Sequence, residues 1–166
     1  MLRLFTASLL SLFLVASAGF ADEVSVKRSY VDLEWGQMHL RILNSVLDKE
    51  SFFEIGPFYG RARITGLARV NGFPVGVMAN NPKFNGGSMD IAAGEKTLRL
   101  LDLCEIFHLP IVYFADEPGF SVGPKQEEMG IVRAGARVVR AFSASRTPYI
   151  TYVVRQLYGV AGGLHA

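Results

Sequence analysis

The chain has 166 residues but only one cysteine, Cys104, and few charges: 19% of its residues are charged and the net charge is +2. One cysteine cannot form an internal disulfide, and a chain of this size does not need one, so cysteine usage leaves the cellular compartment open. The helical pattern beside Leu100 and Leu101 favours a buried, inert thiol over a nucleophile. A net charge this small implies neither nucleic acid nor an anionic membrane as a partner.

Motifs of side-chain catalysis are also scarce. No Gly-x-Ser-x-Gly turn occurs, so a serine hydrolase has no nucleophile, although residues 30–42 faintly resemble the opening strands of an α/β-hydrolase. Asp116 and Glu117 are adjacent and would point apart on a strand or tight turn, so we do not expect a catalytic carboxylate pair. Three histidines lack metal-ligand spacing: His39, His108 and His165.

The first 21 residues predict a secretory signal peptide. Arg3 precedes an apolar run over residues 4–15, and two small-residue cleavage options follow, residues 16–18 and 19–21. The run is shorter than the roughly 18 residues of a membrane-spanning helix, which favours cleavage over a membrane anchor. A mis-set start codon is a third reading. Loss of Arg3 would reduce the net charge to +1 and leave residues 22–166, the size of one ordinary domain.

Residues 22–50 form a short N-terminal segment with few structural signals. Tyr30, Asp32 and residues 35–42 suggest a short hairpin with Gly36 at its turn. Residues 51–166 are more regular and form the second part of the chain. There, strands are predicted at residues 52–55, 63–70, 75–79, 111–114 and 149–154, and helices at residues 90–108 and 126–144.

These elements predict an α/β fold with a largely parallel sheet. Asn71-Gly72 indicates a hairpin, and the apolar run at residues 111–114, bounded by breakers, indicates a buried parallel strand. Asp90 lies at the start of the first long helix. We expect residues 64–68, 75–79, 111–114 and 149–154 to share one sheet, covered by the two long helices through right-handed crossovers. The second of these helices has four small or apolar residues on one face: Ile131, Gly135, Val138 and Phe142.

Two glycine-containing turns are candidate ligand sites. Residues 116–120 leave a strand at its carboxyl end, where open α/β sheets bind ligands. The run 158–163 is Tyr-Gly-Val-Ala-Gly-Gly, whose backbone N–H groups could face an anion at the start of a helix. Because only three residues follow this run, we expect the chain to hold half of a site. A lone glycine pair would more often be a tight turn.

The segments 66–80, 116–120, 130–136 and 158–161 together resemble the C-terminal domain of the biotin-dependent acyl-CoA carboxyltransferases, as in the β subunits of propionyl-CoA and related carboxylases. The resemblance covers about residues 51–163, in order and at the family's spacing. It implies a crotonase-type (ClpP-like) spiral of βαβ units, truncated here at its C-terminal end. It also implies transfer of a carboxyl group from carboxybiotin to the α-carbon of an acyl-CoA.

In that family the protein's main task is to hold two oxyanions, which explains the absence of an obvious acid, base or nucleophile. The resemblance assigns the backbone N–H groups of Val160 and Ala161 as biotin-side oxyanion donors, and Gly119, Phe120 and Gly159 as biotin-binding residues. The family commonly has a glycine where Val160 stands, so biotin would approach less closely here. Biotin would be carried by a separate carrier protein and not attached covalently to this chain.

The family pairs two domains, one holding acyl-CoA and one holding biotin, across two subunits. This chain matches only part of the second, so the resemblance predicts a fragment that is inactive alone, with a biotin carboxylase, a biotin carrier subunit and acyl-CoA as partners of the full oligomer. The alternative is an exported, non-catalytic fragment or fusion that uses this segment as a scaffold. The N-terminus favours a secreted or periplasmic location, whereas the family's function implies the cytoplasm. A small crotonase-like hydratase would need a longer chain.

A row of three arginines has two possible interpretations. Arg133, Arg137 and Arg140 follow helical spacing and most simply form a solvated face. The same stripe would suit a subunit interface or the phosphates of CoA.

Overall fold

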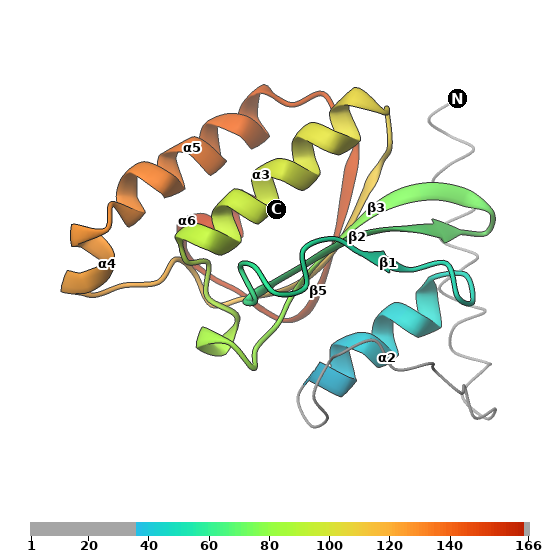
Figure 1. The fold of residues 1–166 in the computed structure, drawn as a ribbon, viewed down its shortest axis with the longest axis horizontal. Helices are drawn as coiled ribbons and strands as arrows, with labels where there is room; N and C mark the ends of the chain where they lie inside the picture. Colours follow the sequence, from blue (N-terminus) through green and yellow to red (C-terminus); the bar gives the residue numbers. More distant parts are fainter. Residues whose placement is uncertain (1–35, 165–166) are drawn as a thin grey trace.

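The computed structural model describes residues 36–164, so the predicted signal peptide, Tyr30, Asp32, Trp35 and His165 lie outside the described residues. Figure 1 shows a sheet with helices on both faces. The elements are α2 (Gly36–Val46), β1 (Phe53–Glu54), β2 (Arg63–Val70), β3 (Phe73–Asn80), the 3₁₀ helix η1 (Asn85–Gly87), α3 (Ile91–Ile106), β4 (Ile111–Glu117), α4 (Pro124–Glu128), α5 (Ile131–Ala144), β5 (Tyr149–Leu157) and α6 (Gly159–Gly163).

The five strands form one sheet in the order β1-β2-β3-β4-β5. The pairs β1-β2 and β2-β3 are antiparallel, and the pairs β3-β4 and β4-β5 are parallel, so the sheet is mixed and not largely parallel as predicted. Ile111 pairs with Gly76 on one side and with Tyr149 on the other. The predicted single sheet is therefore confirmed, as is the Asn71-Gly72 hairpin, in which both residues have positive φ.

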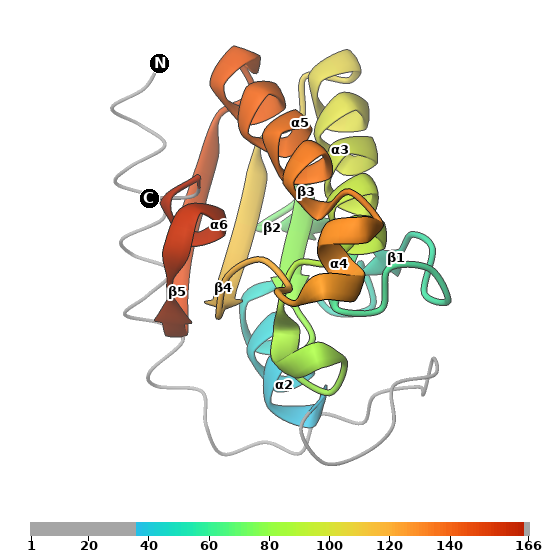
Figure 2. The ribbon, with the colours of Figure 1, turned by 90° about the vertical axis from the view of Figure 1, so that its left-hand side faces the viewer.

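Helices cover both faces of the sheet, and each face has its own core. In Figures 1 and 2, α3 and α5 lie side by side over one face, and α2 lies against the other. The first core joins Met78 and Tyr113 to Leu101 of α3 and Val138 of α5. The second joins strand residues such as Val77 and Val112 to Leu43 and Leu47. Every residue of β4 is buried, as expected for a strand covered on both faces.

Helix α2 replaces the hairpin predicted around Gly36, and that prediction is wrong. Gly36 is the first residue of the helix and not a turn. The apolar residues Ile42, Leu43, Val46 and Leu47 recur with helical spacing, which places them on one face against the sheet. Leu43 is 1% exposed, whereas Arg41 and Ser45 point to solvent. The helical spacing of these apolar residues therefore explains why the segment forms a helix and not a hairpin.

Two other boundaries differ from the sequence-based expectation. Strand β4 continues through Asp116 and Glu117, which were predicted to lie in the following turn. Both carboxylates have arginine partners, so the strand stays buried beyond its apolar run. The helix expected over residues 126–144 is broken into α4 and α5 at Gly130, whose φ is +88°. Helix α3 begins as predicted, because Asp90 accepts a hydrogen bond from the Ala93 N–H.

Strand β5 lies at the edge of the sheet and leaves apolar side chains exposed. Val153 is 56% exposed and Val160, just beyond the strand, is 66% exposed. Leu157 is partly buried and packs against the first core. Over residues 36–164, no helix combines the length and apolarity needed to cross a bilayer.

Candidate functional site

The two predicted glycine turns meet at the carboxyl end of the sheet. One follows β4 and contains Gly119, and the other follows β5 and contains Gly159. The Tyr158 N–H donates to the Glu117 carbonyl at 2.8 Å, and a Cβ placed on Gly159 would lie 3.9 Å from the Gly119 Cα. Both glycines have positive φ, +118° and +64°, which glycine adopts without strain. Parallel neighbouring strands end at one edge of the sheet, which brings these turns together.

Phe120 is held between the first turn and α5. Met89 forms a parallel bridge with Phe120: its N–H donates to the Gly119 carbonyl at 2.9 Å, and its carbonyl accepts from the Ser121 N–H at 3.0 Å. The ring of Phe120 lies over Gly135, where an added Cβ would be 3.1 Å from Cζ of the ring. The aromatic side chain therefore has a fixed place beside the turn.

A shallow groove of about 360 Å³ opens between the two turns and α5. It is lined by Phe120, Ser121, Val122, Glu127, Ile131, Val132, Gly135, Ala136, Val139 and Val160. Of the five predicted site residues, Phe120 and Val160 line this groove, whereas Gly119, Gly159 and Ala161 do not. Its polar members, Ser121 and Glu127, were missed by the sequence reasoning. The Ser121 hydroxyl is buried and has no hydrogen-bond partner within residues 36–164.

Helix α6 presents backbone donors at the end of the groove. The Tyr158 carbonyl accepts from the Gly162 N–H at 3.0 Å, which closes the first turn of the helix. The N–H groups of Val160 and Ala161 have no acceptor among the described residues, as is usual at the start of a helix. Ala161 is buried and Val160 is exposed, so the chain dips from the surface into the first core at this point.

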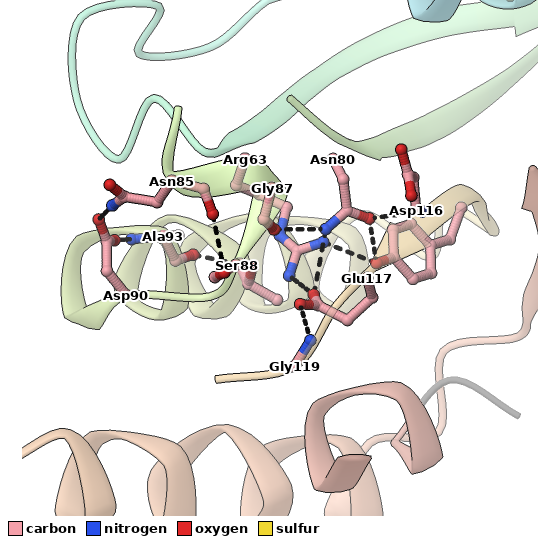
Figure 3. A network of polar contacts seen from close by, with 12 residues as sticks. Arg63, Asn80, Asn85, Gly87, Ser88, Asp90, Ala93, Asp116, Glu117 and Gly119 are labelled. Atoms are coloured by element: carbon pink, nitrogen blue, oxygen red, sulfur yellow. Dashed lines mark hydrogen bonds and ion pairs between the residues drawn. The ribbon is translucent and has the colours of Figure 1, made fainter. Parts of the chain in front are cut away.

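Beneath the first turn lies a buried polar cluster of four residues, which we call the Glu117 cluster: Arg63, Asn80, Tyr113 and Glu117. Figure 3 labels Arg63, Asn80 and Glu117 of this cluster. Nη2 of Arg63 is 2.5 Å from Oε2 of Glu117, and both side chains are fully buried. Nη1 of Arg63 donates to the Tyr113 hydroxyl at 2.7 Å. The cluster therefore joins β2 to β4 across the intervening β3.

Asn80, at the end of β3, completes the cluster. Its Nδ2 donates to the Gly87 carbonyl at 3.0 Å and to Oε2 of Glu117 at 3.1 Å. Its Oδ1 accepts from the Tyr113 hydroxyl at 2.5 Å and from the Asp116 N–H at 3.0 Å. The side-chain amide of Asn80 thus has both its donor and its acceptor in use, as a buried amide requires.

Burial changes the proton affinity of this cluster. Burial alone lowers the pKa of Arg63, but attraction to the oxygens of Tyr113 and Glu117 raises it above its ordinary value, so the guanidinium stays charged. Burial raises the pKa of Tyr113 to about 12, because the phenolate would lie in the interior. Nearby, burial lowers the pKa of Lys96, whose ammonium donates to the Arg63 carbonyl at 2.8 Å.

The adjacent carboxylates Asp116 and Glu117 point to different partners. Glu117 contacts Arg63, whereas Oδ1 of Asp116 accepts from Nε of Arg155 at 3.0 Å. Both carboxyl side chains are at most 1% exposed, so neither is free to take a proton from a ligand in the groove. The ion pairs hold β4 to β2 and to β5.

The other residues singled out in the sequence lie away from the groove or have structural roles. The three arginines of the α5 stripe, Arg133, Arg137 and Arg140, are exposed. Cys104 is fully buried, and burial raises the pKa of its thiol to about 11, which fits an inert residue. Among residues 36–164, no three His, Cys, Asp or Glu side chains come together as a metal site would require.

Residues 37–163 match the model of the carboxyl transferase domain. The chain is 41% identical over 129 residues to the uncharacterized carboxylase YngE of Bacillus subtilis, and 42% identical over 120 residues to the mitochondrial propionyl-CoA carboxylase beta chain of Homo sapiens. The matched parts make up 78% and 72% of this chain but 25% and 22% of the relatives, so the chain spans about a quarter of their length.

Solved structures agree with this assignment. The transcarboxylase 12S crystal structure with methylmalonyl-coenzyme A and methylmalonic acid bound matches with a TM-score of 0.72 and 35% identity. The match covers 75% of this chain and 24% of that chain. The fold is therefore a part of the crotonase-type spiral, and the chain belongs to the carboxyl transferase domain family.

Proposed function

We propose that this chain forms the biotin side of an acyl-CoA carboxyltransferase active site. The observation that carries the proposal is the meeting of the Gly119 and Gly159 turns around an apolar groove with unpaired backbone donors at its end. Relatives named as propionyl-CoA carboxylase subunits supply the reaction class, and a coenzyme A thioester is the substrate class. A partner that carries biotin and an acyl-CoA domain would complete the site.

The residues present fit biotin. The thioether ring and the alkyl chain of biotin are apolar, which suits a wall made by Phe120, Val132 and Val139. Its ureido oxygen is an acceptor, which suits the N–H groups of Val160 and Ala161 at the start of α6. When bound, carboxybiotin supplies the carboxyl group of the reaction. Loss of one backbone donor to a developing oxyanion typically costs about 3 kcal/mol of transition-state stabilisation.

The chain's own side chains support a role in binding and orientation. Asp116 and Glu117 are buried in ion pairs, and the Cys104 thiol is buried against Gly76 of β3. Glu127 is the carboxylate on the groove wall, on the short helix α4. We therefore propose that residues 36–164 mainly place one reactant, with Glu127 as the carboxylate among the groove-lining residues.

Binding of free biotin tests the proposal directly. Ligand-observed NMR on the purified chain should detect binding, and two variants should move it in opposite directions. Val160→Gly removes a 66% exposed side chain from the groove and should strengthen binding several-fold. Val160→Pro removes the N–H donor and should weaken binding about tenfold. The control is Ile106→Ala, at an exposed position in α3 that does not line the groove.

Catalysis by the isolated chain provides the second test. Decarboxylation of methylmalonyl-CoA or malonyl-CoA with free biotin should be absent, while a full-length carboxyltransferase shows turnover. Orientation of two reactants can be worth roughly 7 to 11 kcal/mol, which one side of a site does not supply. Turnover near the control's rate would overturn the assignment of only the biotin side. Failure of both the parent chain and Val160→Gly to bind biotin would favour a non-catalytic scaffold.

A further inference from the structure

Glu117 forms hydrogen bonds to both turns of the candidate site. Its side-chain Oε1 accepts from the Gly119 N–H at 3.1 Å, and its main-chain carbonyl accepts from the Tyr158 N–H at 2.8 Å. Gly119 lies in the first turn, and Tyr158 immediately precedes Gly159 in the second. A displacement of Glu117 would therefore disturb the two turns together.

The position of Glu117 is itself fixed from two other strands. Its Oε2 accepts from Nη2 of Arg63 at 2.5 Å and from Nδ2 of Asn80 at 3.1 Å (Figure 3). Arg63 starts β2 and Asn80 ends β3, so the carboxylate is anchored to both. The Arg63 backbone is held in turn by the buried ammonium of Lys96, 2.8 Å from its carbonyl oxygen. The anchor is thus part of the rigid sheet.

We infer that Glu117, held by Arg63 and Asn80, is a positioning residue that sets the Gly119 and Gly159 turns at a fixed separation for the ligand. The identity of that ligand as biotin rests on the proposed function, whereas the coupling of the two turns does not. Glu117 has no exposed side-chain surface and acts through the backbone on either side of the groove. It is therefore not a catalytic residue.

The same bonds limit which groups can reach a ligand. The Gly119 N–H is used by Oε1 of Glu117, so it does not point a donor into the groove. The backbone N–H groups left without an acceptor are those of Val160, which lines the groove, and of the buried Ala161, both on one side. Gly119 contributes a close backbone approach to Tyr158, whose carbonyl would lie 3.7 Å from a Cβ placed on Gly119.

Glu117→Gln is the informative variant, because every group that hydrogen-bonds to the Glu117 carboxylate is a donor. Arg63, Asn80 and Gly119 all donate N–H groups to it. A carboxylate accepts at both oxygens, whereas a glutamine amide has one acceptor and one donor group. In any orientation, glutamine must face at least one N–H with its own NH₂. The variant keeps the volume of the side chain and removes one anchor.

Amide hydrogen exchange is the main readout, measured at the hydrogen-bonded amides of Gly119, Tyr158 and Gly162. Rates are compared with those of the β2-β3 hairpin, so that a global loss of stability cancels. The matched control is Glu54→Gln, which removes another carboxylate facing a buried cation, Lys96. Free-biotin binding is measured on the same samples. If Glu117→Gln does not fold, Arg63→Lys tests the anchor with its charge preserved.

We expect Glu117→Gln to accelerate exchange at all three amides at least tenfold relative to the hairpin, and to weaken biotin binding about tenfold. Glu54→Gln should leave both ratios unchanged. Exchange that rises at Gly119 alone would overturn the coupling of the two turns. If the parent chain binds no biotin but the three amides respond together, the positioning role holds and the proposed function fails. The two ideas are thereby tested separately.

Discussion

The sulfur of Cys104 fills the space over the Cα of Gly76, so that a methyl group on Gly76 would overlap Sγ. Cys104 lies on α3 and Gly76 on β3, and this contact sets how closely the helix approaches the sheet. The thiol of Cys104 occupies the space that a side chain at position 76 would need.

Gly76→Ala should therefore destabilise the fold by overpacking, by about 1 to 3 kcal/mol. Cys104→Ala removes the sulfur and leaves space for the added methyl, so the double variant should recover most of that loss. Chemical denaturation of the parent chain, both single variants and the double variant gives the coupling energy. Additive losses in the double variant would show that the two side chains do not compete for one space.

The Cys104 thiol should be unreactive in the folded chain. Burial raises its pKa from 9.0 to about 11, so the folded state holds the proton more tightly than the unfolded chain. The resulting stabilisation is present below about pH 9 and is lost as the pH rises through 11, by about 2 to 3 kcal/mol in total. Ellman's reagent at pH 8 should react only after denaturation.

The alkaline loss of stability has its own control. Between pH 9 and 11, the parent chain should lose more unfolding free energy than Cys104→Ala, because only the parent carries the thiol. Titration of Tyr113, whose pKa is raised to about 12, follows at higher pH in both proteins. Equal pH profiles for the two proteins would contradict the burial of this thiol.

Removal of one member of the Arg63–Glu117 pair should be costly. Arg63→Met leaves the Glu117 carboxylate buried without its cation, and such a change typically costs about 3 to 5 kcal/mol. Arg63→Met combined with Glu117→Leu removes both charges and should recover most of this loss. Thermal and urea unfolding measure both. A double variant no more stable than Arg63→Met would mean that the polar cluster, and not the ion pair, carries the stability.

The exposed edge strand β5 should favour self-association. Tyr149, Ile150 and Val153 are 41%, 36% and 56% exposed on a strand whose outer edge has no neighbour among the described residues. Val153→Lys should shift the sedimentation profile toward monomer and reduce binding of a dye for apolar surfaces. Ser143→Lys adds the same charge on the exposed side of α5 and should change neither. A chain that is monomeric before any substitution would refute the prediction.

Local signals predicted the parts of the structure that depend on neighbouring residues. The Asn71-Gly72 pair identified the hairpin, and Asp90 identified the start of α3, because a turn or a cap needs only adjacent residues. The family resemblance assigned the two glycine turns to one biotin side, and the parallel pairing of β4 and β5 explains why they meet. Gly36, however, was predicted to lie in a turn, although the helical spacing of Leu43 and Leu47 indicates the helix that the structure shows.

The Glu117 cluster could not be predicted in this way. Arg63 and Glu117 are 54 residues apart, and each alone looks like a charged residue near the end of a strand. The polar character of Asp116 and Glu117 suggested that β4 ended before Asp116. The strand continues to Glu117, because each of these carboxylates has an arginine partner. The wall of the groove formed by Val132 and Val139 also depends on how α5 crosses the sheet.

The buried ion pair also bears on the accuracy of folding. Arg63 is paired with Asn80 across β2 and β3, and its side chain reaches Glu117 on the same face of the sheet. A slip of one residue between β2 and β3 would turn Arg63 to the opposite, apolar face of the sheet. Arg63 and Glu117 would then both be buried charges without a partner. A purely apolar ladder would tolerate such a slip far better. We therefore expect the Arg63–Glu117 pair to disfavour sheets in which β2 and β3 are out of register.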